Sequence, residues 1–158
     1  MKKTISILGA TGSVGLNVLK IISIKKSYFN INLLSANKNF KAICGQIEKF
    51  NPKIYLVSDM STYLKVKNKF KRKKITVENN LDNLKFNFRN SDISVAAIPG
   101  IAGLNPTLKI ITKSKKILIA NKESIISGWP LIKKMASKFK TKIVPVDSEH
   151  FSIMKLLE

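Results

Sequence analysis

Short apolar runs alternate along this chain with longer stretches of helical periodicity. The short runs are rich in β-branched residues, which is typical of strands that are buried on both faces of a sheet. The longer stretches repeat apolar residues three and four positions apart, which predicts amphipathic helices. We therefore predict strands at 4–8, 31–34, 54–57, 93–98, 117–120 and 143–146, and helices at 13–24, 40–50, 60–70, 106–112 and 123–139.

Prolines and glycines mark the expected ends and irregularities of these elements. The second helix should stop before Pro52, because the residue preceding a proline disfavours helical backbone. Pro106 suits the first turn of its helix, where no amide hydrogen is needed. Gly128 and Pro130 predict an irregularity or a break in the last helix. Residues 75–90 are ambiguous and could hold a short strand and a short helix.

The order of the elements predicts the fold class. Strands that alternate with helices indicate β-α-β units, and such units build a parallel sheet. Right-handed crossovers then bring helices onto the sheet from both sides. We therefore predict an α/β fold with a Rossmann-like, doubly wound, mostly parallel sheet and helices on both faces.

A glycine-rich turn, GATGSVG at residues 9–15, follows the first predicted strand. Its G-x-x-G-x-x-G spacing is a variant of the dinucleotide-binding fingerprint, in which glycines let the backbone turn tightly and approach a pyrophosphate. The helix that starts near Ser13 would add unpaired amides and the positive end of its dipole. A glycine-rich turn without a ligand is the alternative.

The second predicted strand is followed by Asn37-Lys38-Asn39. An NAD enzyme usually carries an acidic residue here for the ribose 2′-hydroxyl, and this chain has none. The ammonium of Lys38 and the amides of Asn37 and Asn39 would suit a 2′-phosphate, which favours NADP over NAD. An exposed lysine without a ligand, in a lysine-rich chain, is the alternative.

Further chemistry-bearing residues follow the last two predicted strands. Lys122 lies where it could meet a charged or polar substrate, and Ser148 could hydrogen-bond the same substrate. Asp147 and Glu149, separated by one residue, carry the oxygen ligands that Mg²⁺ and Mn²⁺ prefer. A helix cap formed by Asp147 or Ser148 is the alternative.

The net charge first indicates nucleic-acid binding. The 158 residues include 29 Lys and Arg against 9 Asp and Glu, which gives a formal charge of +20. However, only Arg72 and Arg89 are arginines, and arginine is the residue suited to bidentate contacts with bases and phosphates. Lysine, isoleucine and asparagine are abundant and have AT-rich codons, so codon bias explains the charge better. We do not expect nucleic acid as a partner, and a basic nucleic-acid-binding module is the alternative function.

Other classes are excluded by simpler observations. No apolar run reaches the roughly 18 residues of a membrane span, and the first residues show no secretory cleavage pattern. Cys44 is the only cysteine, which excludes a disulfide scaffold and fits a reducing compartment. We therefore expect a cytoplasmic protein with no membrane partner.

Five segments together resemble 1-deoxy-D-xylulose 5-phosphate reductoisomerase: ILGATGSVG (7–15), ANKN (36–39), IPGIAGL (98–104), LIANKES (118–124) and VPVDSEH (144–150). They follow that family's order and cover nearly the whole chain, and the last two are the specific signature. The resemblance implies a bacterial, NADPH-dependent oxidoreductase. Such an enzyme rearranges and reduces a phosphorylated ketose, 1-deoxy-D-xylulose 5-phosphate, to the isoprenoid precursor 2-C-methyl-D-erythritol 4-phosphate.

The resemblance also implies roles for individual residues. Lys122, Ser148 and Glu149 would contact substrate, with Lys122 and Glu149 catalytic, and Asp147 and Glu149 would bind Mn²⁺ or Mg²⁺. Position 37 departs from the family, which commonly has glycine there, although asparagine tolerates left-handed backbone better than most residues. The implied NADPH contacts are Thr11, Gly12, Ser13, Val14, Asn37, Lys38, Asn39, Asn121 and Glu123.

The same resemblance predicts the domain organisation. Residues 1–146 would form the NADPH-binding domain, and residues 147–158 would begin a truncated catalytic domain. Complete members need a further glutamate ligand, contacts to the substrate phosphate, a flexible lid and a C-terminal helical domain, and their connecting region supports a homodimer. We therefore expect an incomplete copy, and an NADP-binding fragment without turnover is the second alternative.

Overall fold

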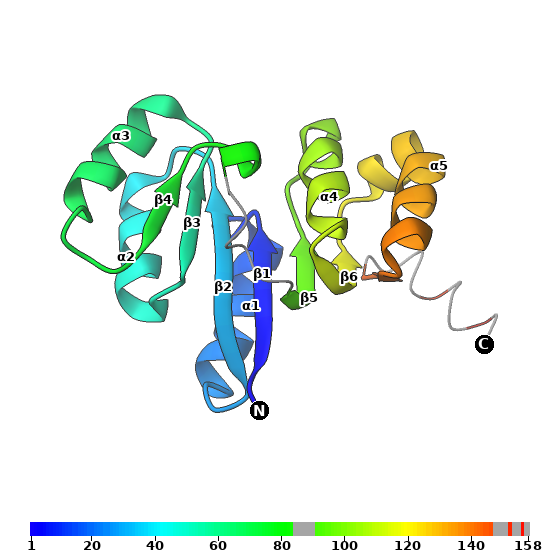
Figure 1. The fold of residues 1–158 in the computed structure, drawn as a ribbon, viewed down its shortest axis with the longest axis horizontal. Helices are drawn as coiled ribbons and strands as arrows, with labels where there is room; N and C mark the ends of the chain where they lie inside the picture. The colour runs from blue at the N-terminus through cyan, green and yellow to red at the C-terminus, as the bar shows by residue number, and fades with distance from the viewer. Residues whose placement is uncertain (84–90, 147–151, 153–155, 157–158) are drawn as a thin grey trace.

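A computed structural model describes residues 1–83, 91–146, 152 and 156. Within these residues a single sheet runs through the molecule, with strands in the order β4-β3-β2-β1-β5-β6-β7 (Figure 1). All neighbouring strands are parallel, as the alternation of strands and helices predicts. The strands are β1 (Lys3–Leu8), β2 (Phe29–Ala36), β3 (Ile54–Val57), β4 (Thr76–Glu78), β5 (Ser91–Ala96), β6 (Ser114–Ile119) and β7 (Lys142–Pro145).

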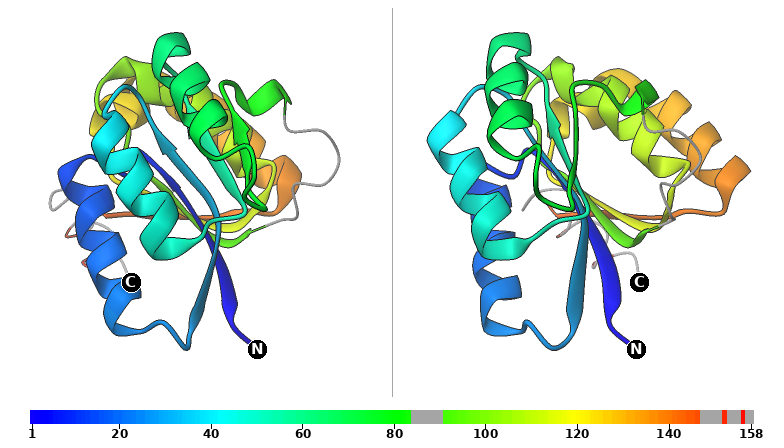
Figure 2. Two further views of the ribbon diagram at one scale, coloured as in Figure 1. Left: turned by 90° about the vertical axis from the view of Figure 1, so that its left-hand side faces the viewer. Right: turned by 60° about the vertical axis from the view of Figure 1, so that its left-hand side comes forward.

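Helices cover both faces of this sheet. The helices are α1 (Ser13–Ile24), α2 (Phe40–Phe50), α3 (Met60–Lys69), α4 (Leu104–Ile111) and α5 (Lys122–Phe139), with short 3₁₀ turns η1 (Leu81–Asn83) and η2 (Ile101–Gly103). Figure 2 shows α1 and α2 on one side of the strands and α4 and α5 on the other. The predicted Rossmann-like, doubly wound α/β fold is thus confirmed.

The alternation of side chains along β1 explains why the sheet needs both layers. Ile5 and Ile7 point into a core formed with α1, α2 and α3. Leu8 points into a second core formed with α4 and α5. Because successive strand residues face opposite sides and Ile5 to Leu8 are all buried, this part of β1 needs a helical layer on each face.

The direction of winding reverses at β1. This strand pairs with β2 on one side and with β5 on the other, although the chain visits β3 and β4 in between. In open α/β sheets ligands bind beyond the carboxyl ends of strands at such a switch point. The fold therefore directs attention to the residues that follow β1 and β5.

The predicted break in the last helix is wrong. α5 continues through Gly128 and Pro130 to Phe139. Pro130 cannot donate to the carbonyl of Ile126, but both residues are exposed, so water can take the place of that amide. Gly128 is buried against the side chain of Leu104 in α4, so it marks a close helix–helix contact.

Other local expectations hold. α2 ends at Phe50, and Asn51 caps it in the left-handed conformation with φ of 44° directly before Pro52. Pro106 lies in the first turn of α4. The ambiguous 75–90 segment contains β4 and η1, and its last residues, 84–90, lie outside the described part of the chain. No helix in the described ranges has both the length and the apolar character to cross a bilayer.

Asp92 ties the beginnings of β1, β5 and β6 together. Lys115 Nζ donates to one carboxylate oxygen at 2.7 Å, and the amide and hydroxyl of Thr4 donate to the other at 2.9 Å. The hydrogen bond from Lys115, followed by those from Thr4, lowers the pKa of Asp92 to about 2. Because this value lies below the ordinary carboxyl pKa of about 4, the stabilisation is complete above pH 4 and is lost as pH falls towards 2.

We expect Asp92→Asn to lower the free energy of unfolding by about 1 kcal/mol at neutral pH. The difference between variant and parent should shrink as pH falls from about 5 to about 2, because the parent then loses the same charge. Urea unfolding at a series of pH values measures both quantities. A difference that stays constant over this range would contradict the assigned role of the carboxylate.

Candidate functional site

Four loops meet at the carboxyl edge of the sheet. Leu8, Ala96 and Ile119 lie side by side at the ends of β1, β5 and β6. The chain therefore leaves all three strands at the same level, and the amide of Ala97 still donates to the carbonyl of Leu8 at 3.0 Å. On the other side of β1, the end of β2 leads into residues 37–39. The structure thus brings together the candidate segments that sequence order keeps apart.

The turn after β1 needs its glycines for two different reasons. Gly9 has φ of +83°, in the left-handed region that side chains rarely adopt, and a Cβ there would meet the carbonyl oxygen of Ala97 at 2.5 Å. Gly15 has ordinary helical backbone, but a Cβ on it would meet the carbonyl of Gly9 and the backbone of Ala10. The first glycine makes the turn possible, and the second lets α1 start directly against it.

Ser35 and two further side chains hold this turn, and sequence reasoning missed all three. Ser35, on β2, accepts from the amide of Gly9 through its hydroxyl at 3.1 Å and from the amide of Ala10 through its carbonyl at 2.7 Å. Gln46 Nε2, on α2, donates to the carbonyl of Ala10 at 2.8 Å, and Tyr55 donates to Gln46 at 2.6 Å. A glutamine on the apolar face of a predicted helix was the available signal.

The N-terminus of α1 points towards the same edge without a side-chain cap. Gly12 is the N-cap residue, no side chain in the described chain caps the helix, and the first turn has no acidic residue. Gly12, Ser13 and Val14 are exposed, and Thr11 is partly exposed. The first amides of a helix lack carbonyl partners within it, so this end offers donors and a positive potential to an anion.

The Asn37-Lys38-Asn39 segment is exposed at the end of β2. The side-chain oxygen of Asn39 accepts from the amide of Ala42 at 3.1 Å and thereby caps α2. Lys38 lies close enough to Asp59 to contribute to its lowered pKa of about 2, of which hydrogen bonding by Thr62 is the larger cause. Asp59 is therefore ionised at neutral pH.

Asn121 has a structural position. Its side chain is 2% exposed, and Nδ2 donates to the carbonyls of Ile98 and, at 2.8 Å, of Gly100. Its Oδ1 accepts from the amide of Ser124 at 2.9 Å and caps α5. Asn121 thus fastens the loop after β5 to the start of α5. Its predicted contact with a cofactor stays a prediction.

Lys122 and Glu123 are exposed in the first turn of α5, at the same edge of the sheet. The other substrate and metal candidates, Asp147, Ser148 and Glu149, lie outside the described residues, as does the predicted domain boundary at 147. Within 1–83, 91–146, 152 and 156, no three His, Cys, Asp or Glu side chains lie close enough to hold a metal ion. The metal assignments therefore stay predictions.

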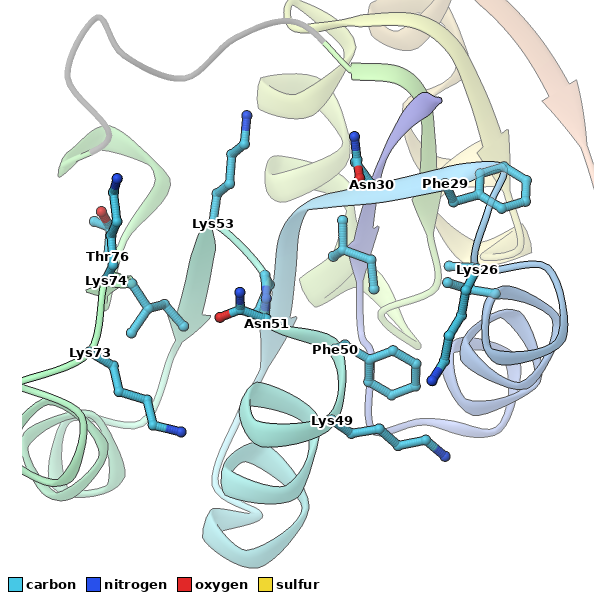
Figure 3. A pocket seen from close by; sticks show the side chains of 14 residues that line it. Lys26, Phe29, Asn30, Lys49, Phe50, Asn51, Lys53, Lys73, Lys74 and Thr76 are labelled. Carbon is cyan, nitrogen blue, oxygen red and sulfur yellow. The ribbon is translucent and has the colours of Figure 1, made fainter. Parts of the chain in front are cut away.

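A large cavity of about 910 Å³ lies at the opposite, amino edge of the sheet. Figure 3 shows Lys26 and Lys49 beside Phe29 and Phe50 on one side of it, and Lys53, Lys73 and Lys74 on the other. The residues around it begin β2, β3 and β4, so it is remote from the turn after β1. It carries lysines and no arginine, so it offers point charges without the bidentate contacts typical of nucleic-acid recognition.

Comparison with known proteins decides the family. Residues 5–128 match the family model of 1-deoxy-D-xylulose 5-phosphate reductoisomerase. The chain belongs to this reductoisomerase family. The resemblance carried by the five sequence segments is thereby confirmed.

Relatives within the reductoisomerase family match almost all of this chain. The enzyme of Pelagibacter ubique is 50% identical over 159 residues, which cover 99% of this chain and 41% of the relative. The enzyme of Clostridium novyi is 40% identical over 169 residues and is matched over 42% of its length. The chain therefore spans about two fifths of the length of these relatives.

Solved structures of the family superpose on the same region. The Zymomonas mobilis reductoisomerase in complex with NADPH has a TM-score of 0.86 at 33% identity, covering 95% of this chain and 40% of that chain. A reductoisomerase in complex with NADPH, fosmidomycin and magnesium has a TM-score of 0.84 at 31% identity, covering 94% and 37%. A WlbA dehydrogenase from Bordetella pertussis, at 10% identity and a TM-score of 0.62, shares the fold alone.

Proposed function

We propose that this chain is the NADPH-binding part of a 1-deoxy-D-xylulose 5-phosphate reductoisomerase. The observation that carries the proposal is the uncapped N-terminus of α1 behind a turn that only Gly9 allows, at the switch point of the sheet. The similarity to a family member in complex with NADPH supports the same conclusion.

Different residues at the carboxyl edge of the sheet would bind different parts of the cofactor. The amides of Thr11, Ser13 and Val14 would hold the diphosphate, because anions bind at free helix N-termini. Gly12, whose own amide donates to the carbonyl of Gly9 at 3.1 Å, would let the backbone approach the diphosphate closely. Lys38, with Asn37 and Asn39, would hold the 2′-phosphate as a point charge. The nicotinamide would lie on the side of β5 and β6, near Asn121, Lys122 and Glu123. When bound, NADPH supplies the hydride for reduction of the substrate.

A small cavity lies on the β2 side of the turn, where the adenosine would be expected. Its volume is about 120 Å³, and it is bounded by the ends of β1, β2 and β3 and by α4. Leu8 and Leu56 contribute apolar walls, while Ser35, Asn79 and Asn80 contribute polar groups. Apolar walls with a few polar groups are typical of small-molecule sites, and a cavity of this volume would take only part of the adenosine.

The substrate half of the proposal rests on family membership. Lys122 would contact the phosphorylated ketose, and Ser148 and Glu149 would join it. Asp147 and Glu149 would hold Mn²⁺ or Mg²⁺, which orients the oxygens of the substrate when bound. Loss of NADPH absorbance with 1-deoxy-D-xylulose 5-phosphate and Mn²⁺ tests whether this chain turns over. NADPH binding without such loss would support the narrower alternative, an NADP-binding unit.

Lys38 gives the direct test of cofactor choice. We expect Lys38→Ala to weaken NADPH binding about tenfold or more, because it removes the charge opposite the 2′-phosphate. NADH lacks that phosphate, so its affinity should change little. Isothermal titration of both nucleotides against parent and variant measures the difference.

Lys133→Ala is the matched control for general charge effects. Lys133 is exposed on α5, on the other face of the sheet. Its replacement by alanine removes one positive charge, as Lys38→Ala does, without changing residues 37–39. It should leave both affinities unchanged. Equal binding of NADPH and NADH by the parent, together with no effect of Lys38→Ala, would defeat the 2′-phosphate assignment.

A further inference from the structure

A buried hydrogen-bond chain connects the third strand to the cofactor turn. Tyr55 OH donates to Gln46 Oε1 at 2.6 Å, and Gln46 Nε2 donates to the carbonyl of Ala10 at 2.8 Å. Tyr55 and Ala10 are 0% exposed and Gln46 is 6% exposed, so water does not compete for these bonds. Three elements far apart in sequence, β3, α2 and the turn, are thus joined by polar atoms inside an apolar core.

The direction of each donor in this chain is fixed. The carbonyl of Ala10 can only accept, so the NH₂ group of Gln46 must face it, and the amide oxygen is left to face Tyr55. Burial raises the pKa of Tyr55 above its ordinary range, so the phenol keeps the proton that it donates to this oxygen. Tyr55 thereby stabilises the one amide orientation of Gln46 that can bind a carbonyl.

The carbonyl that Gln46 holds controls an amide on the opposite side. The peptide unit between Ala10 and Thr11 is planar and trans, so its C=O and N–H point in opposite directions. Holding the Ala10 oxygen against Gln46 of α2 therefore turns the Thr11 amide away from α2. The amide of Ala10 is itself bound to the carbonyl of Ser35 at 2.7 Å, so the preceding peptide unit cannot rotate either.

We propose that Tyr55 and Gln46 are positioning residues that aim the Thr11 amide at the diphosphate of the dinucleotide. This inference rests on the proposed NADPH site and adds a buried pair of hydrogen bonds that orient the turn before the ligand binds. Preorganised donors bind more tightly than donors that must be ordered on binding. Neither side chain touches the ligand, so both act only through the backbone of the turn.

Two variants and two ligands separate positioning from general damage. Gln46→Leu should weaken NADP⁺ binding about tenfold, because the Ala10 carbonyl loses its partner and the peptide unit is free to turn. Adenosine 2′-monophosphate has no diphosphate, so its affinity, measured by ligand NMR, should change less than about twofold. Equal weakening of both ligands, or of neither, would overturn the proposal. If the parent binds neither ligand, the proposed function fails with it.

A double-mutant cycle tests whether Tyr55 acts through Gln46. Tyr55→Phe alone should weaken NADP⁺ binding by a few-fold, since the amide loses the donor that fixes its orientation. Tyr55→Phe combined with Gln46→Leu should bind NADP⁺ no more weakly than Gln46→Leu alone. If Tyr55→Phe weakened NADP⁺ binding by the same factor with and without Gln46→Leu, Tyr55 would act independently of Gln46, and the proposal would be contradicted. Unfolding curves of each variant, recorded beforehand, set a temperature at which all are folded.

Gln46→Glu adds a readout that a purely structural role would not produce. At neutral pH the carboxylate of the variant has no hydrogen to donate, so one of its oxygens would face and repel the oxygen of Ala10. NADP⁺ binding should therefore weaken. Burial and this carbonyl raise the pKa of such a carboxyl, so its protonated form can donate as the amide did. Binding by the variant, relative to the parent, should therefore recover as pH falls from about 8 to about 5. A pH-independent ratio would count against the proposal.

Discussion

Gly9→Ala is expected to lower the free energy of unfolding by about 3–5 kcal/mol and to abolish measurable NADPH binding. Left-handed backbone at φ of +83° costs a residue with a Cβ about 1–2 kcal/mol. The new methyl group would also lie 2.5 Å from the carbonyl oxygen of Ala97, which belongs to the backbone and cannot rotate away. Relief requires β1 and β5 to separate at the turn that would present amides to the cofactor, so stability and binding should fail together.

Gly45→Ala is the matched control. Gly45 is an exposed glycine of α2, and no atom lies within 4 Å of a Cβ built on it. The same change there should stabilise the protein by about 0.5–1 kcal/mol, because alanine favours helix over glycine. Urea unfolding followed by circular dichroism measures both variants. Similar stabilities for Gly9→Ala and Gly45→Ala would show that the turn is not constrained as described.

Asn121→Asp is expected to have the second large effect. The substitution keeps the shape of the side chain, but it replaces a nitrogen that donates to the carbonyls of Ile98 and Gly100 by an oxygen. At neutral pH this places a buried carboxylate against two carbonyl oxygens, which should cost about 3–5 kcal/mol of unfolding free energy. The hydrogen bond between Oδ1 and the amide of Ser124 is kept. The loss of unfolding free energy therefore measures the two hydrogen bonds that clamp the loop after β5 to residue 121.

The destabilisation caused by Asn121→Asp should increase with pH. Burial against carbonyls raises the pKa of the introduced carboxyl above its unfolded value, so its destabilisation grows as pH rises and shrinks below about pH 4. Asn105→Asp is the control, because Asn105 is exposed in the first turn of α4, where a negative charge is neutral or slightly favourable. Thermal unfolding at about pH 7 and about pH 4 compares the two. A pH-independent deficit for Asn121→Asp would contradict the clamp.

Sequence predictions that depended on neighbouring residues were correct, and one that depended on contacts between distant elements was wrong. Of the elements in the described residues, the five α-helices and six of the seven strands were found because their apolar periods are local, whereas β4 fell in the ambiguous segment. α2 ended before Pro52, as proline geometry requires. The expected break at Gly128 and Pro130 failed because the outcome depended on solvent at Ile126 and on the side chain of Leu104 in another helix. Neither the exposure of Ile126 nor the contact of Gly128 with Leu104 can be read from a local pattern.

The candidate site shows the same division. Gly9 and the N-terminus of α1 were predictable, since a strand, a glycine turn and a helix follow one another directly. Gln46 and Tyr55 were not, because their polar atoms meet the turn only after three elements have packed together. The resemblance assigned Asn121 to the cofactor, which stays a prediction, and only the structure shows that its side chain also joins the loop after β5 to the start of α5.

By itself, the sequence determined the α/β class, the glycine turn and membership of the reductoisomerase family, because each is carried by short local segments and by their order along the chain. Only the tertiary structure decided that the winding reverses at β1, that the loops after β1, β5 and β6 leave the sheet at one level, and that the turn is held from beneath by Gln46. Those facts depend on which distant strands pair, and pairing is fixed by the packing of whole faces, which no local pattern contains.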